Sequence, residues 1–356
     1  MILERAEVLI VGGGIAGLST AFHLARSGVR GVVLAEREAL PGFHASGRNA
    51  GIARQLTGRP EHTALAIQGR ERLAQAGLME TRGGILLGAD PGGAGPLARE
   101  AEVFGLEAIL AEGSPYGELK AAEHLRVAGD GIIDIYGLLG ACVQGAREGG
   151  VSLRFGCPVT VLEADGAGFT VDLGGARLRV RTLVNAAGAW AGALGRGAGG
   201  LDLAFAPLRR HLAWSREPYP ATRPYTWWAD RPFYLRPERG GVLLCPCDEG
   251  PVDPPGPGAQ PRVDAAVLAG LEASRGDLAP GLPELPLARA WAGIRTFSPD
   301  RRFVLGPDPV NPRLFWVAGL GGHGMTSGLA VGAWAARALR EEIPGGALDP
   351  GRFSPH

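Results

Sequence analysis

The sequence predicts a mixed α/β protein with two domains, and three observations support that prediction. The chain has 356 residues, 46% of them hydrophobic and 20% charged, so it is long enough for two globular cores. Residues 8–11 and 32–34 are short apolar runs on either side of a glycine turn and an Ala/Leu-rich segment, which is the pattern of a βαβ unit. Residues 207–247 concentrate aromatic side chains among alternating positions, which is typical of an antiparallel sheet that carries a pocket wall.

The other regular elements follow from the spacing of apolar residues. Two segments have helical spacing, and three short apolar runs after them have the character of strands. The helices are expected at residues 61–73 and 135–147, and the strands at residues 151–155, 159–162 and 183–184. We find no repeat of fixed period.

Glycine and proline mark the segments without regular structure. Residues 89–96 and 250–261 are rich in both and are expected to be surface loops. Residues 314–336 are apolar enough to resemble a membrane span, but glycines and His323 interrupt the run. A strand, a glycine loop and a helix that ends near Leu339 fit this segment better.

Charge and cysteine content exclude several classes of function. Lys plus Arg and Asp plus Glu number 36 each, so no net field attracts a polyanion and no nucleic-acid partner is expected. The four cysteines form no CxxC pair, so neither a disulfide framework nor a metal site is expected. Cys245 and Cys247 flank one proline and are expected on one face of a strand. The N-terminus lacks the pattern of a signal peptide, so we expect a cytoplasmic protein.

A dinucleotide-binding fingerprint follows the first strand. Gly12, Gly14 and Gly17 form G-x-G-x-x-G at the start of the first helix, where glycines permit a tight turn and a close approach of a pyrophosphate to the backbone. The helix N-terminus supplies free N–H groups and partial positive charge. Glu36 ends the second strand, and its carboxylate suits ribose hydroxyls and repels a 2′-phosphate. An NADP-type ligand is therefore disfavoured, while NAD and FAD both remain open.

Several further segments carry a family resemblance. They are residues 12–17, Glu36-Arg37 followed by residues 41–51, and residues 184–190, 291–300 and 314–326. On these stretches the sequence resembles the D-amino-acid oxidase (DAO) superfamily of FAD-dependent oxidoreductases. Within it, bacterial D-arginine and other D-amino-acid dehydrogenases are the most similar members, with matches also at Arg209-Arg210 and residues 233–237.

The resemblance implies a domain arrangement and a cofactor. A Rossmann-type FAD-binding domain of the GR2/DAO kind would comprise residues 1–75, 132–205 and 290–356, and a second α+β substrate domain on an antiparallel sheet would comprise residues 76–131 and 206–289. No cysteine stands near Arg295, where related sarcosine oxidases attach their flavin, so noncovalent FAD is expected.

The resemblance also implies the cofactor contacts, from the fingerprint to the C-terminal glycine loop. That loop precedes a helix whose N-terminus, aimed at the flavin N1/C2 edge, would stabilise the reduced anion by roughly 0.3 to 2 kcal/mol. The expected contacts are Gly12, Gly14, Ile15, Ala16, Gly17, Glu36, Arg37, Ser46, Gly47, Arg48, Asn49, Ala50, Gly51, Val159, Ala187, Gly188, Trp190, Arg295, Gly321, Gly322, His323, Gly324, Met325 and Thr326.

Four residues are expected at the reacting end of the site. Arg295 matches an arginine that grips the substrate carboxylate in related oxidases, a task that suits a bidentate guanidinium, although an ion pair with Asp300 would also explain it. By resemblance, Tyr234 lies over the substrate or serves only packing, and Arg210 is a second pocket arginine. His323 contacts flavin or substrate, or is a structural histidine.

Two departures from the family pattern bear on specificity. Gly84 aligns roughly with an acidic residue that holds the basic tail of D-arginine, so a strong preference for D-arginine is not expected. Related oxidases use a lysine to activate oxygen, but the one lysine here, Lys120, lies in a polar segment far from the flavin motifs. A dehydrogenase that passes electrons to another, unknown acceptor is therefore favoured over an oxidase.

The expected reaction is the oxidation of an amino acid or related amine, with preference for a D-amino acid carried by resemblance. Hydride transfer from Cα to flavin N5 would give an imino acid, which water converts to a keto acid and ammonia. No residue is assigned as base. One alternative is a dehydrogenase of a 2-hydroxy acid or glycerol phosphate, which would need His323 or His211 as base. Another is a noncatalytic flavoprotein. Membrane association through an electron-transport partner stays open.

Overall fold

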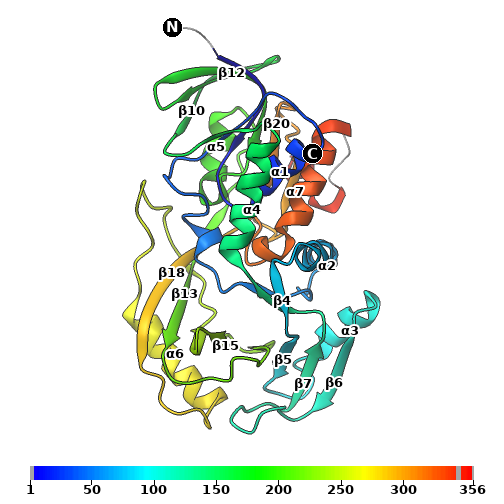
Figure 1. Cartoon of the computed structure of the whole chain (residues 1–356), viewed down its shortest axis with the longest axis vertical. Helices are drawn as coiled ribbons and strands as arrows, with labels where there is room; N and C mark the ends of the chain where they lie inside the picture. Colours follow the sequence, from blue (N-terminus) through cyan, green and yellow to red (C-terminus); the bar gives the residue numbers. More distant parts are fainter. Residues whose placement is uncertain (1–3, 342–345, 355–356) are drawn as a thin grey trace.

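The computed structural model describes residues 4–341 and 346–354. The ribbon has two lobes along its long axis, each built on one large sheet (Figure 1). The upper lobe contains an eight-stranded sheet and the lower lobe a nine-stranded sheet. A small sheet of β3 (Ile52–Ala53), β4 (Met79–Thr81) and β8 (Gly131–Ile133) lies where the chain passes from one lobe to the other. The expected α/β fold is confirmed.

The upper sheet has a parallel centre. Its strands are β1 (Glu4–Val11), β2 (Val32–Ala35), β9 (Ser152–Arg154), β10 (Val159–Asp165), β11 (Gly168–Leu173), β12 (Ala176–Asn185), β19 (Val304–Pro307) and β20 (Leu314–Ala318). Strand β1 pairs in parallel with β2 and β12, and β12 pairs in parallel with β20. Strands β10 and β11 extend this sheet as an antiparallel hairpin, and β19 pairs antiparallel with β20.

Helices cover both faces of the upper sheet, which explains why its central strands are apolar throughout. Ile10 faces a core with α1 (Ile15–Arg26), α4 (Ile135–Glu148) and α7 (Gly324–Glu341), while Leu9 faces the opposite core with α5 (Ala191–Gly197). Helix α2 (Pro60–Gln75) packs across α7. The βαβ unit and the expected strand, glycine loop and C-terminal helix are thus confirmed.

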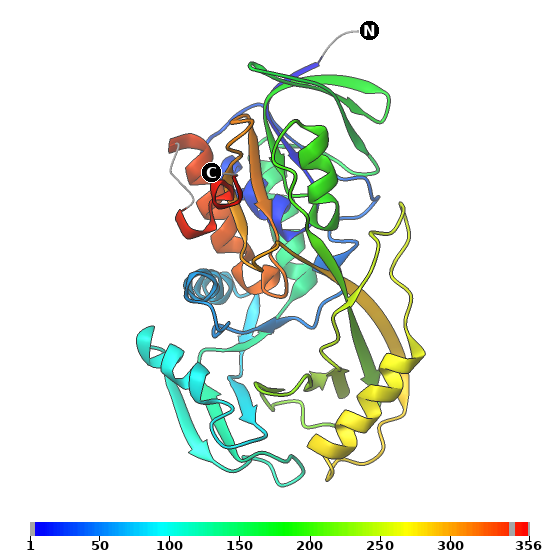
Figure 2. The same ribbon diagram turned by 180° about the vertical axis from the view of Figure 1, so that it is seen from behind.

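The lower sheet is almost wholly antiparallel. Its strands are β5 (Gly84–Gly88), β6 (Ala108–Glu112), β7 (Glu123–Val127), β13 (Ala206–Ser215), β14 (Tyr225–Trp228), β15 (Tyr234–Glu238), β16 (Gly241–Cys245), β17 (Gly250–Pro251) and β18 (Leu287–Phe297). Within this sheet, β5 and β14 form the single parallel pair among the described strands. Helix α3 (Gly95–Val103) follows β5, and α6 (Ala265–Leu278) lies along the lower sheet in both views (Figures 1 and 2).

The alternation of residues in the lower sheet makes it a wall with two different faces. Leu235 and Leu244 pack into the core that contains α6, whereas Tyr234, Leu243 and Cys245 belong to a separate cluster on the other face. This alternation follows from the two-residue period of a strand. The expected antiparallel sheet with a pocket wall is therefore present.

The two expected loops and the cysteine pair differ from the sequence-based expectation. Helix α3 begins at Gly95, inside the expected loop 89–96, and β17 occupies the start of loop 250–261. Cys245 and Cys247 do not share a strand face, because β16 ends at Cys245 and Cys247 has a positive φ of 51°. The boundary expected at residue 290 falls inside β18, which pairs with β13 of the lower sheet, so the division into domains remains a prediction.

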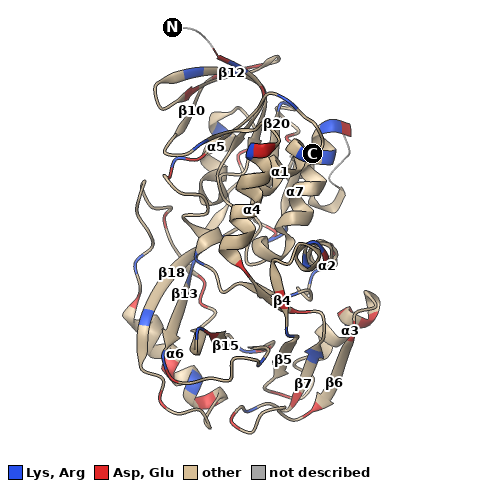
Figure 3. Cartoon of the chain, in the orientation of Figure 1, with Lys and Arg blue, Asp and Glu red and all other residues tan. Residues whose placement is uncertain are grey.

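Acidic and basic residues are distributed over both lobes (Figure 3). None of the described helices combines the length and apolar character needed to cross a membrane.

Candidate functional site

A cavity of about 660 Å³ extends from the N-terminus of α1 to the lower sheet. Its size lies within the range of small-molecule and cofactor sites. Its lining includes the ends of β1 and β2 with the start of α1, parts of segments 42–52 and 186–197, residues 158–161 at the start of β10, Pro257, and the C-terminal glycine loop with residues of β13, β15 and β18. Both sheets therefore contribute to one site.

The first part of the cavity is formed by the fingerprint. Gly14, Ile15 and Ala16 line it, and the Ile15 N–H donates to Ser46 Oγ at 2.9 Å. Gly12 and Gly17 do not line it. Gly12 has φ 118° and a Cβ there would collide with the Ala186 carbonyl, while a Cβ on Gly17 would collide with the Gly12 carbonyl. These two glycines shape the turn, and Gly14 leaves the start of the helix open.

Glu36 and Arg37 line the cavity at the end of β2. Glu36 Oε2 accepts the Gly13 N–H at 2.6 Å and Oε1 accepts the Glu38 N–H at 2.8 Å. A carboxylate has further lone pairs that can accept from hydroxyl groups. The Arg37 guanidinium lies 3.8 Å from the centroid of a Trp190 ring, a cation–π contact between two lining residues.

The middle of the cavity is lined by Ser46, Arg48, Asn49, Ala50, Gly51, Val159, Ala187, Gly188 and Trp190. Gly47 is not among the lining residues, because it packs against Gly42, whose carbonyl a Cβ would meet at 2.6 Å. Arg48 Nε donates to the Ala292 carbonyl at 2.9 Å, and burial lowers the pKa of Arg48. The guanidinium is thus fixed at the junction with β18.

The C-terminal glycine loop lies at the start of α7. Gly321, Gly322, Gly324, Met325 and Thr326 line the cavity there. An α-helix leaves its first N–H groups without intrahelical partners, so this end carries partial positive charge. The loop joins the lower lobe closely, since a Cβ on Gly322 would lie 2.8 Å from Nη1 of Arg295.

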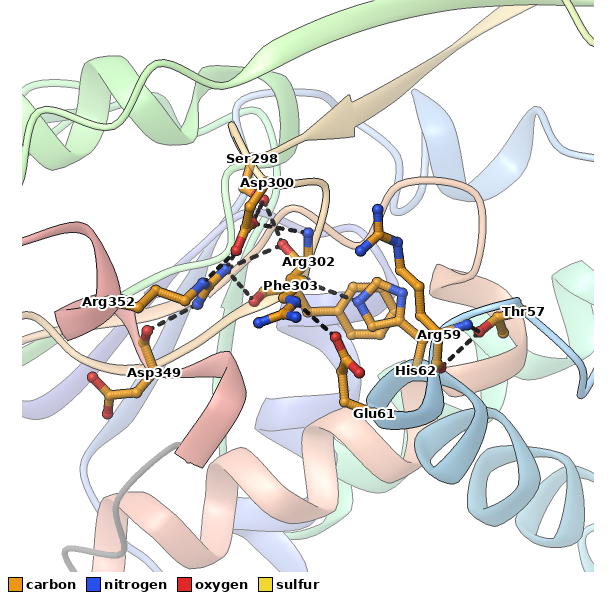
Figure 4. A network of polar contacts seen from close by, with 10 residues as sticks. All are labelled: Thr57, Arg59, Glu61, His62, Ser298, Asp300, Arg302, Phe303, Asp349 and Arg352. Carbon is orange, nitrogen blue, oxygen red and sulfur yellow. Dashed lines mark hydrogen bonds and ion pairs between the residues drawn. The ribbon is translucent and has the colours of Figure 1, made fainter. Parts of the chain in front are cut away.

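His323, from the same loop, does not line the cavity. Its ring centroid lies 6.2 Å from that of His62, and burial together with the charge of Arg54 holds its pKa well below the usual value. His62 in turn stacks on Phe303 with centroids 3.9 Å apart and accepts the Phe303 N–H at Nε2 (Figure 4). The position of His323 fits a structural histidine better than one in contact with a substrate in the cavity.

Arg210, Tyr234 and Arg295 come together at the other end of the cavity, from β13, β15 and β18. Arg295 forms no ion pair with Asp300, which instead binds Arg352 at 2.8 Å (Figure 4). The alternative explanation of Arg295 as a partner of Asp300 is therefore wrong. Burial and the positive charge of Arg210 lower the pKa of Arg295.

The polar groups around Arg210 are incompletely paired. Nη2 donates to Glu249 at 3.1 Å, but Nε and Nη1 are buried without a hydrogen-bond partner in the described part of the chain. Glu249 is shared, since it also binds Arg301 at 2.8 Å. Tyr234 is 2% exposed and its ring packs 4.5 Å from that of Trp227. Two guanidinium groups thus face one cavity with little negative charge near them.

His211 is fully buried and lies outside the cavity lining. Its Nδ1 faces Asp248 Oδ2 at 2.8 Å, and its Nε2 accepts the Asp264 N–H at 2.9 Å. Because both ring nitrogens are used, no free nitrogen remains for a proton from a ligand.

No sequence signal indicated that loop 250–261 lies beside the cavity. Its Pro257 lines the cavity, Arg37 donates to the Pro255 carbonyl at 3.0 Å, and the Gly258 N–H donates to Glu38 at 2.9 Å. The loop is thus tied to the segment that follows β2. Only the three-dimensional arrangement reveals these contacts, because the two segments are more than 210 residues apart.

Comparisons with known proteins agree with this geometry. The chain is 30% identical to mitochondrial dimethylglycine dehydrogenase of Rattus norvegicus, over 98% of this chain but only 45% of that protein, so it spans about half the length of this relative. Its structure resembles L-proline dehydrogenase from P. horikoshii, with a TM-score of 0.86 and 21% identity over 99% and 98% of the two chains. It also resembles L-α-glycerophosphate oxidase from Mycoplasma pneumoniae, with a TM-score of 0.83 and 16% identity over 95% of each chain.

The structural likenesses are below 25% identity and show the fold. The family is shown by the family model for DAO, "FAD dependent oxidoreductase", which matches residues 7–338. With the fingerprint, the glycine loop and the cavity between them in place, the chain belongs to the DAO family of FAD-dependent oxidoreductases.

Proposed function

We propose that this protein oxidises an amino acid or a related secondary amine with FAD as cofactor, and that it does so as a dehydrogenase. The observation that carries the proposal is the pair Arg210 and Arg295, which line the cavity, with Nε and Nη1 of Arg210 lacking a hydrogen-bond partner among the described residues. A carboxylate is the natural ligand for such a pair, since guanidinium groups bind it through two parallel hydrogen bonds. A preference for D-amino acids rests on the resemblance to D-amino-acid dehydrogenases alone.

The residues present fit FAD. Gly14 leaves the N-terminus of α1 open to a pyrophosphate, Glu36 offers carboxylate oxygens beside it, and the N-terminus of α7 supplies partial positive charge at the far end. None of the four cysteines lines the cavity in the described part of the chain, which supports noncovalent binding. Bound FAD would supply the acceptor for the two electrons released from the Cα–H bond.

The chain itself would bind and orient the substrate. Arg295 and Arg210 would hold the carboxylate, and the buried ring of Tyr234 would limit where the substrate carbon can lie. Holding a substrate in one geometry lowers the barrier because translational and rotational freedom is already lost. The lower sheet would keep water from this end of the cavity, and loop 250–261 would cover the end beside Glu38.

Two features refine the substrate and the acceptor. A side chain at Gly84 would collide with the Tyr225 ring at 2.5 Å, so this position has no room for the acidic residue that would hold D-arginine. Lys120 is exposed and faces Asp277 at 3.2 Å, outside the cavity lining. Both observations support a substrate other than D-arginine and an acceptor other than oxygen.

The hydroxy-acid alternative is less well supported. Oxidation of an alcohol needs a base for the hydroxyl proton, but His211 has both nitrogens engaged and His323 lies outside the cavity lining. An amine can react once it is neutral and needs no base at the moment of hydride transfer.

The proposal is tested by turnover with an artificial electron-accepting dye and a panel of D- and L-amino acids, secondary amines, 2-hydroxy acids and glycerol phosphate. We expect turnover of amino acids or N-alkyl amino acids, with release of ammonia or of the alkylamine. Turnover of hydroxy compounds alone would establish the alternative. Retained FAD with no turnover of any compound would support a noncatalytic flavoprotein.

A further inference from the structure

Cys245 lies directly behind the substrate end of the cavity. It ends β16 opposite Tyr234 of β15, it belongs to the same cluster as Leu212 and Leu243 on the cavity side of the sheet, and it is fully buried. Leu212 and Tyr234 line the cavity. The sulfur is therefore separated from the site by one layer of side chains.

The turn after β16 directs a donor at this sulfur. Cys247 has φ 51°, a conformation that is costly for a residue other than glycine, and its N–H donates to Cys245 Sγ at 3.3 Å. Hydrogen bonds from N–H groups stabilise a thiolate more than a thiol, because the charged sulfur is the better acceptor. The strained turn thus favours negative charge at Cys245.

The positive charges that face Cys245 also favour a thiolate at this position. Arg210 approaches from β13 and Arg295 from β18, and Glu249 is the single carboxylate bound to either in the described part of the chain. Buried cations without partners are costly. Three acidic groups could balance them: Cys245, Cys247 and Tyr234.

Only one of the three is favoured as an anion. Burial opposes ionisation of Cys245, but a hydrogen bond from the Cys247 side chain and the charges of Arg210 and Arg295 lower its pKa to about 6. The same side-chain hydrogen bond raises the pKa of the Cys247 thiol, and burial raises the pKa of Tyr234 well above its usual value. The buried sulfur at Cys245 would therefore carry the charge at neutral pH.

We propose that Cys245 is a resident thiolate that balances the charges of Arg210 and Arg295 before the substrate binds. When the substrate carboxylate replaces the thiolate as the partner of the two arginines, Cys245 accepts a proton through the Tyr234 hydroxyl. This inference rests on the proposed function. The substrate enters as an ammonium carboxylate; its ammonium gives one proton to the phenol oxygen as the phenol gives its own to the sulfur. The products are a neutral amine, a neutral phenol and a thiol, so protons and charge balance. Cys245 would thereby fill the role of proton acceptor that the sequence left unassigned.

The first test is spectroscopic and needs no turnover. The ultraviolet thiolate absorbance of the holoenzyme is followed against pH in wild type, Cys245→Ala and Cys142→Ala, the last being a buried cysteine of α4 whose pKa is raised by burial to about 12. We expect one thiolate with a midpoint near 6 in wild type and Cys142→Ala, and none in Cys245→Ala. A nonreducible carboxylate should move the midpoint upward. The absence of a thiolate below pH 8 in wild type would overturn the proposal.

The second test is the pH profile of anaerobic flavin reduction by an amine substrate. In Cys245→Ala the rate should fall at least tenfold at neutral pH and return to the wild-type rate at high pH, where the substrate amine is already neutral. Cys245→Ser is the control for a change in packing, because serine is close to cysteine in size. It should behave as Cys245→Ala does, because its hydroxyl stays protonated. Parallel profiles in wild type and both variants would overturn the role in proton transfer. If the thiolate titrates but no amine reduces wild type, the proposed function fails and the resident thiolate stands.

Discussion

At the scale of single residues, the central observation is a cationic pair that has almost no negative partner. The sequence alone suggested Arg295 and Arg210 by resemblance, but left an ion pair between Arg295 and Asp300 as a second explanation. The structure removes that explanation because Asp300 binds Arg352 and Ser298. The pairing of Asp300 with Arg352 could not be foreseen from the sequence, because Arg352 is distant in the chain and belongs to no motif.

Replacing Arg295 should separate carboxylate recognition from the rest of the site. A charge-assisted pair is worth about 1.5 to 3 kcal/mol, so Arg295→Met should lower kcat/KM for an amino acid by roughly 10- to 150-fold. The same variant should act almost equally on the amino acid and on its decarboxylated amine. Steady-state kinetics with both compounds checks this. Arg289→Met, at the exposed start of the same strand, is the control, and equal losses in the two variants would argue against a carboxylate site at Arg295.

The buried His62 should make the folded protein less stable in acid. Burial lowers its pKa from 6.5 to about 4, so the unfolded chain binds a proton in a pH range where the folded chain does not. The contribution of neutral His62 to the free energy of unfolding is complete above pH 6.5 and is lost as the pH falls toward 4. The loss is about 3 kcal/mol at most. Urea unfolding at several pH values should give a flatter pH dependence for His62→Gln, whose amide oxygen can accept the Phe303 N–H. An unchanged slope would mean that His62 does not titrate as described.

At the scale of elements, the sequence predicted what local pattern encodes. The βαβ unit, α4 and the loop before α7 were all foreseen from apolar runs and glycine positions. The positions that could not be foreseen depend on pairing between distant segments: the β13/β18 register that places Arg210 and Arg295 together, and loop 250–261 beside Glu38. His323 illustrates the same limit, because its loop faces the cavity while its ring packs toward His62.

The close packing of α1 against α7 should affect the stability of the protein independently of its catalytic activity. A Cβ at Gly332 would collide with Ser19, so Gly332→Ala should lower the free energy of unfolding by about 1 to 3 kcal/mol. Gly140 on α4 has open space around it, so Gly140→Ala should raise the free energy of unfolding by about 0.5 to 1 kcal/mol. Urea unfolding of the two variants measures both. Equal effects of the same sign would contradict this packing.

At the scale of the whole molecule, the two sheets form one site. The upper sheet provides the glycine turn and both helix N-termini, and the lower sheet provides the arginine pair and Tyr234. Neither lobe holds the complete cavity. A ligand that bridges them stabilises the folded state by mass action, about 2.7 kcal/mol at a hundredfold excess over its Kd. We therefore expect added FAD to raise the unfolding temperature of the protein.

The most direct measurement of the central claim is an anaerobic titration followed in the visible spectrum. The purified protein, with FAD added if needed, is mixed with an amino acid or N-alkyl amino acid while the absorbance of oxidised flavin is recorded. We predict that this band is lost with one equivalent of substrate per flavin, and that Arg295→Met needs far more substrate to reach the same loss. A protein that binds no flavin, or a flavin band that no amine diminishes, would contradict the proposed amine oxidation.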